Sequence, residues 1–244
     1  MRFIRLFWFH FKEYLSDQYF VTLTLTSTLS IFLVQYTLAY ANHQLTNTSI
    51  WLQSAIFGMW SSCTTAAGSI GFERYKGTLP YLINNAYDER LSLIALLLPA
   101  STYGLAAFPL AWFLAQLLGV TTGAITFKFS LTVILLWLAM ATMGIFIASF
   151  FTLTPNAITY ESLIGTPLVL LSGLFGNPVF LRPLIKIAQW FIPMTTPIAA
   201  LTGTSSTLNW SAYFSSLIIW FFLIILMVKK INQLARKKGE LNLI

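Results

Sequence analysis

The sequence predicts an all-α integral membrane protein with six transmembrane helices, an N-terminal interfacial amphipathic helix and an outer-leaflet re-entrant helical hairpin between spans five and six. Hydrophobic residues make up 57% of the 244 residues, and charged residues only 9%. An ordinary soluble domain carries about 25% charged residues, so most of this chain's surface does not face water. The charges also gather at the ends of apolar runs, each long enough for the roughly 20 residues of a spanning helix.

The first 18 residues combine aromatic and charged side chains in a helical repeat. Aromatic residues recur at Phe3, Phe7, Phe11 and Tyr14, whereas Arg5, Lys12, Glu13 and Ser16 lie on another side. This pattern predicts an amphipathic helix over 1–18 that lies in the plane of the lipid headgroups. A cytoplasmic extension of the first span is the alternative interpretation.

Six apolar runs follow, and together they predict a single membrane domain over 1–244. The runs cover 19–41, 50–71, 91–118, 126–152, 157–176 and 209–230. The third contains Pro99 and Pro109, and we expect a kink there rather than a break, because neighbouring helices can satisfy the freed carbonyls. The connection between the fourth and fifth runs is very short, so those two spans should form an antiparallel hairpin.

Glycines and prolines interrupt the apolar sequence between the fifth and sixth spans, at Gly173, Gly176, Pro178, Pro183 and Pro193. The pieces between them are too short to cross a bilayer. The segment 177–208 is therefore predicted to form two short helices that dip into the outer leaflet and are buried against protein.

Lysine and arginine fix the expected orientation. With the N-terminus inside, the inner side receives Arg2, Arg5, Lys12, Arg74, Lys76, Arg90, Lys229, Lys230, Arg236, Lys237 and Lys238, and the outer side receives Lys128, Arg182 and Lys186. Eleven cations against three predict that both termini are cytoplasmic. The net charge of +7 is thus expected to meet membrane lipids rather than nucleic acid.

The predicted spans contain almost no ionisable side chains. Lys128 and Glu161 come nearest, each close to a helix end, and the two histidines, His10 and His43, lie outside the spans. Intramembrane charge usually marks a coupling pathway, so its scarcity argues against a proton-coupled transporter, an intramembrane enzyme or a metal site. A phosphate-binding loop that ends in Gly-Lys-Ser/Thr is also missing from the sequence.

The predicted cytoplasmic loop 72–90 mixes charge with exposed apolar side chains such as Leu79, Tyr81 and Leu82. Apolar residues on a short loop indicate docking into a groove of a partner. An interfacial helix lying on lipid is the alternative.

Polar side chains inside the first two spans are candidates for a substrate path. These are Thr22, Thr26, Gln35 and Gln53. Threonines in helices also bond their own backbone carbonyls, and polar residues in spans also hold helices together, so both alternatives stay open.

Two motifs point to a family. Glu73-x-x-x-Gly77-Thr78-Leu79 follows the second span, and Leu171-Ser172-Gly173 precedes Pro178, Pro183 and Pro193-x-Thr195. Their order and placement resemble type 2 ABC exporter permeases over nearly the whole chain. Gly77 of the first motif allows the tight bend that turns the loop back toward the membrane. One departure is Pro80, which stands where the family carries an acidic residue.

The resemblance implies a permease subunit of a bacterial cell membrane that binds no cofactor itself. A second permease, identical or related, would complete a dimer, and separate ABC ATPase subunits would bind ATP and Mg. The residues that would couple this chain to the ATPase are Glu73, Arg74, Lys76, Gly77, Thr78, Leu79, Tyr81 and Leu82. The family's cargo suggests a peptide, a drug or a lipid-like molecule. Two other classes remain as alternatives, namely a membrane enzyme of lipid or peptide processing and a non-transporting immunity or scaffold protein.

Overall fold

The computed structural model describes residues 2–43, 48–75, 77, 89–153, 157–176, 178–205 and 207–238. Its helices are α1 (Arg2–Ser16), α2 (Gln18–Ala41), α3 (Ser49–Tyr75), α5 (Glu89–Tyr103), the 3₁₀ turn η1 (Gly104–Ala106), α6 (Ala107–Leu117), α7 (Phe127–Leu153), α8 (Ala157–Leu171), α9 (Arg182–Ala188), α10 (Thr195–Leu201) and α11 (Trp210–Lys238). These described residues contain no strand, so the all-α prediction is confirmed.

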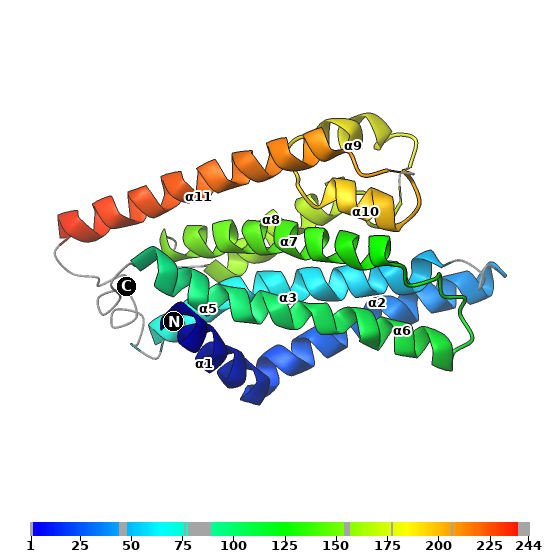
Figure 1. The fold of residues 1–244 in the computed structure, drawn as a ribbon, viewed down its shortest axis with the longest axis horizontal. Coiled ribbons are helices and arrows are strands. Elements are labelled where there is room, and N and C mark those ends of the chain that lie inside the picture. Colours follow the sequence, from blue (N-terminus) through cyan, green and yellow to red (C-terminus); the bar gives the residue numbers. More distant parts are fainter. Residues whose placement is uncertain are drawn as a thin grey trace.

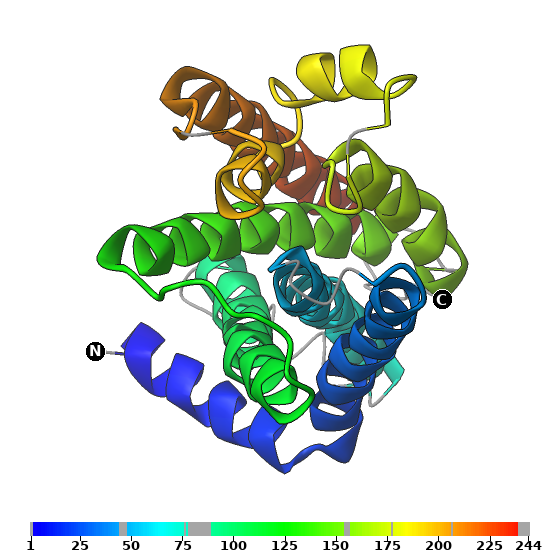
Figure 2. The ribbon, with the colours of Figure 1, turned by 90° about the vertical axis from the view of Figure 1, so that its right-hand side faces the viewer.

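The long helices form an elongated bundle in which α7 lies between two groups (Figures 1 and 2). On one side of α7 are α2, α3, α5 and α6, with α1 at their edge, and on the other are α8, α9, α10 and α11. Helix α3 contacts α2, α5, α6, α7 and α8, so it is the central helix of the bundle.

Within the part of the chain that the structure describes, four helical segments are long and apolar enough to cross a membrane. They are Gln18–Ala41, Leu96–Leu117, Phe127–Phe150 and Trp210–Met227. Of the other two predicted spans, α8 has only 15 residues, and α3 carries hydroxyl side chains that lie buried inside the bundle, such as Ser54 and Ser62. A helix surrounded by protein can be less apolar than one that faces lipid. The count of six spans stays a prediction.

The third predicted span changes its helix type near its middle. Pro99 lies inside α5, Pro109 lies in the first turn of α6, and the 3₁₀ turn Gly104–Ala106 separates the two helices. The two helices nevertheless continue in one general direction (Figure 1). The irregularity therefore falls between the two prolines rather than at either of them.

The N-terminal helix is a separate element and not an extension of α2. Helix α1 ends at Ser16, and Asp17 caps α2, with its carboxylate accepting a hydrogen bond from the backbone N–H of Tyr19 at 2.9 Å. The chain turns sharply at this point, so α1 crosses the end of the bundle (Figure 1). This geometry supports the amphipathic-helix interpretation over the continuous extension.

Between α8 and α11 the structure has two short helices, as predicted, although their environments differ. Helix α10 is buried against the bundle, whereas α9 exposes most of its side chains. Two side chains tie α11 to its neighbours: the Tyr213 hydroxyl donates to the carbonyl of Leu135 at 2.8 Å, and Trp220 Nε1 donates to the carbonyl of Phe191 at 2.6 Å. Re-entry of this segment into the membrane stays a prediction.

Candidate functional site

The predicted coupling segment lies between the end of α3 and the start of α5. Glu73 and Arg74 belong to the last turn of α3, and Gly77 follows the helix. The remaining residues proposed from the sequence, Lys76, Thr78, Leu79, Tyr81 and Leu82, lie outside the described residues, as does Pro80. The two helices that enter and leave this segment are packed against each other, so its two ends are held together by the bundle.

Gly77 takes a backbone conformation that suits glycine. Its φ is +71°, in the left-handed region, and a Cβ built on it would meet no atom within 4 Å. Only the backbone conformation therefore favours glycine there, as at many helix C-termini. This φ agrees with the tight bend expected after the helix, while the docking role of the segment stays a prediction.

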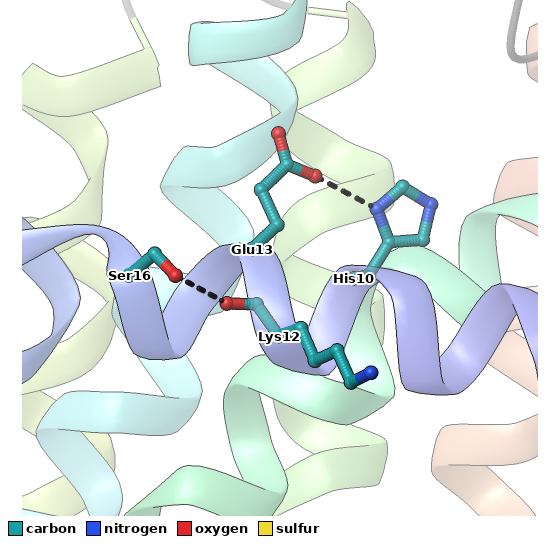
Figure 3. Close-up of polar contacts among 4 residues, drawn as sticks. All are labelled: His10, Lys12, Glu13 and Ser16. Atoms are coloured by element: carbon teal, nitrogen blue, oxygen red, sulfur yellow. Dashed lines mark hydrogen bonds and ion pairs between the residues drawn. The ribbon is translucent and has the colours of Figure 1, made fainter.

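Helix α1 packs against α5, the helix that follows the coupling segment, and crosses it at an angle (Figures 1 and 2). Its buried side carries His10 and Tyr14, and the Tyr14 ring meets the Phe20 ring edge-on at a centroid distance of 4.5 Å. His10 Nδ1 lies 3.2 Å from a carboxylate oxygen of Glu13 one turn later (Figure 3). Helix α1 thereby joins α5 to the first residues of α2.

The exposed side of α1 differs from the one expected. The aromatic repeat that includes Tyr14 suggested a lipid-facing side, but Tyr14 is buried in protein. Of that repeat only Phe3 is exposed, and the other exposed apolar side chains of the helix are Ile4, Trp8, Phe9 and Leu15, with Lys12 exposed among them. One side of the helix therefore packs on α5, and another side exposes both apolar and cationic residues.

Three close contacts hold α3 to its neighbours. The Ser62 hydroxyl donates to the carbonyl of Ala100 in α5 at 2.8 Å. A Cβ added at Gly58 would clash with the Thr28 hydroxyl of α2. A Cβ added at Gly144 of α7 would lie 2.7 Å from the carbonyl oxygen of Cys63. These contacts join the middle of α3 to α2, α5 and α7.

A sequence signal for this packing exists, although we did not predict a role for it. Gly58, Ser62 and Ala66 recur every four residues along α3, and small residues at this spacing let membrane helices approach closely. Ser62 and Ala66 are both buried. The partners in α2, α5 and α7 are far apart in sequence, so the pattern alone does not identify them.

The polar residues proposed for a substrate path do not converge within this single chain. Thr22 and Thr26 are exposed on the side of α2 that faces away from the bundle. The Thr22 hydroxyl donates to the carbonyl of Gln18 at 2.6 Å, and the Thr26 hydroxyl donates to the carbonyl of Thr22 at 2.7 Å. Gln35 and Gln53 are partly buried. The threonines bond their own helix, as one alternative held, and a role in a path between two chains stays a prediction.

The glycines and prolines after α8 end one helix and begin the next. Gly173 and Gly176 have φ values of +76° and +107°, so the backbone leaves the helical conformation after Leu171. Pro178 precedes α9, Pro183 occupies its first turn, and Pro193 is buried between the two short helices. These residues shape the segment and bear no reactive group.

Among the described side chains, no group of three or more His, Cys, Asp or Glu is placed to hold a metal ion. The long apolar helices, packed around the central helix α3, define a multi-pass helical membrane protein. A sequence model of the ABC-2 type transporter family matches residues 1–206. The chain belongs to this family, and the resemblance inferred from its motifs is confirmed. No curated protein and no solved structure gives a match.

Proposed function

We propose that this chain is the transmembrane permease subunit of an ATP-driven exporter, powered by a separate ATPase subunit. The observation that carries the proposal is the family match, which covers residues 1–206 and thus the whole bundle up to α10. The apolar helices fit a membrane permease. The sequence lacks a Gly-Lys-Ser/Thr phosphate loop, so the nucleotide would bind to the partner together with Mg.

Coupling would use residues 72–90. Leu79, Tyr81 and Leu82 would fill a groove on the ATPase, and Glu73 and Arg74 would add polar contacts. Closure of the ATPase would then pull on α3 and α5 together, because the segment connects these two helices along the chain. The close contacts of α3 would carry that displacement into α2 and α7.

A second permease, identical or related, would complete the transport path. The exposed side of α2 with Thr22 and Thr26 would face it. Pro80, which replaces the family's acidic residue, would suit one half of a heterodimer. We further propose six spans, following the apolar runs, and both termini in the cytoplasm, following the Lys and Arg distribution. A bacterial cell membrane as the location follows from the resemblance to the family. An amphiphilic cargo such as a peptide, a drug or a lipid-like molecule fits the aromatic content of 16%.

The test is purification of the full chain from its native membrane in mild detergent. A copurifying ATP-binding chain in fixed stoichiometry, with ATP hydrolysis that this chain stimulates, is the expected result. Reproducible purification without any ATP-binding chain would overturn the proposal. Lipid or peptide turnover by the isolated chain would favour a membrane enzyme, and inactivity without partners would favour a scaffold or immunity protein.

A further inference from the structure

Helix α9 lies at the end of the bundle (Figure 1), and most of its side chains are exposed. Ile185 and Ala188 face the protein and are buried. Leu184 and Ile187 point elsewhere, with 46% and 59% of their surface exposed, and Phe180 just before the helix is 81% exposed. So much contiguous apolar surface usually marks contact with lipid or with another protein.

A cationic side adjoins this apolar side. Arg182 and Lys186 are both exposed, and residues four apart lie on the same side of a helix. Helix α9 therefore has three sides, one buried, one apolar and one cationic. This arrangement matches a helix that lies along a membrane surface, with apolar residues at the acyl boundary and cations at the headgroups.

The charge of this part of the chain has one sign. Between Glu161 and Glu240 the sequence contains no Asp or Glu. Lys128, the first cation of α7, belongs to the same end of the bundle as α9 (Figure 1). Positive charge of this kind at the end of a membrane protein favours contact with an anionic lipid surface.

We propose that the α9 surface, formed by Phe180, Arg182, Leu184, Lys186 and Ile187, lies in the bilayer interface and binds anionic phospholipids. The apolar side chains contact the upper acyl chains, and the two cations bind lipid phosphates. Under the proposed topology this is the outer leaflet. The inference requires only that the chain sits in a membrane, so it can fail while the ATPase partnership stands, and the reverse also holds.

The test places a fluorescent reporter on this surface. An Ile187→Cys variant of the full chain, labelled with a nitrobenzoxadiazole fluorophore, is reconstituted into phosphatidylcholine vesicles. Cys63 is fully buried, so the unsubstituted chain serves as the labelling blank. Phosphatidylcholine or phosphatidylglycerol that carries a nitroxide on the upper acyl chain is then titrated in, and the local quenching of the two lipids is compared.

We expect strong quenching by both lipids and stronger quenching by phosphatidylglycerol. A cation near an anionic surface contributes about fivefold in local affinity, so Arg182→Gln together with Lys186→Gln should lower the preference by up to about 25-fold. The matched control, Lys229→Gln with Lys230→Gln, removes two exposed cations from α11 and should leave it unchanged.

Two results would overturn the proposal. A reporter that no nitroxide lipid quenches would place the α9 surface against protein, for example a second copy of the chain. Equal quenching by the two lipids, unaffected by Arg182→Gln and Lys186→Gln, would leave a lipid contact without the anionic site. Identical gel-filtration profiles of the variants establish that each comparison is made on folded protein.

Discussion

Two glycines have distinct physical reasons to be glycine. Gly144 lets α7 approach the backbone of α3 at Cys63, so its role is steric. Gly77 has open space around it and a positive φ, so its role is conformational. We therefore expect a substitution of Gly144 to lower the stability of the bundle, and a substitution of Gly77 to change the shape of the coupling segment.

Gly144→Ala should destabilise the bundle. The new methyl group would lie 2.7 Å from a backbone carbonyl oxygen, which no side-chain rotation relieves. Overpacking of this kind costs about 1–3 kcal/mol. Each kcal/mol lowers the Tm of a chain of this size by about 2–4 °C. Gly165→Ala is the matched control, because its methyl group would meet only Trp60 at 3.8 Å. A thermal unfolding series in detergent in which both variants behave alike would contradict the close contact.

Gly77→Ala should impair coupling while the bundle stays folded. A residue with a Cβ resists the left-handed conformation by about 1–2 kcal/mol, so the segment would leave α3 in another direction. Gly68→Ala provides the control, since Gly68 also has open space around it but lies inside α3. We expect ATP hydrolysis by the purified complex to lose its stimulation in Gly77→Ala alone. Normal stimulation in that variant would exclude a requirement for this turn.

Among the elements, the interrupted third span depends most on its neighbours. The 3₁₀ turn η1 begins at Gly104, where an added Cβ would lie 3.1 Å from the carbonyl oxygen of Met59. Ser62 donates to the Ala100 carbonyl one turn earlier. At the junction between α5 and α6, helix α3 thus provides both the Met59 backbone packed against Gly104 and the hydrogen bond from Ser62.

Ser62→Ala should loosen this junction. A hydrogen bond between membrane helices contributes about 0.6 kcal/mol on average and at most about 1.7 kcal/mol. Ser54→Ala is the control on the same helix, because the buried Ser54 hydroxyl donates to its own helix at the carbonyl of Ile50. Hydrogen–deuterium exchange should rise at residues 100–106 in Ser62→Ala only. Equal exchange in the two variants would show that the hydrogen bond does not hold the junction.

Long apolar elements could be predicted from the sequence because length and composition are local properties. The runs at 19–41, 126–152 and 209–230 correspond to α2, α7 and α11, although α11 continues to Lys238. The position of η1 could not be predicted, since Met59 and Ser62 determine it from another helix. The burial of Tyr14 was missed for the same reason, because its repeat fits lipid and protein equally well.

In the whole molecule, the helices proposed to respond to ATPase motion lie together at one end of the bundle. Helices α3 and α5 meet there, and α1 packs against α5 (Figure 1). Helix α3, whose C-terminus lies at this end, is also the central helix of the bundle. A force applied at residues 72–90 would therefore reach α2, α6 and α7 without any intramembrane charge. We propose that the motif predicted from the sequence is where that force enters, while the contacts of α3 come from the structure.

The most direct measurement of the central claim is photo-crosslinking from Leu82 in native membranes. A benzoylphenylalanine at this position should form an adduct with an ATP-binding chain, identified by mass spectrometry. The control position is Phe127, which is 85% exposed at the other end of the bundle and should give no such adduct. Adducts from Leu82 with lipid alone, or with no ATP-binding chain, would contradict the account.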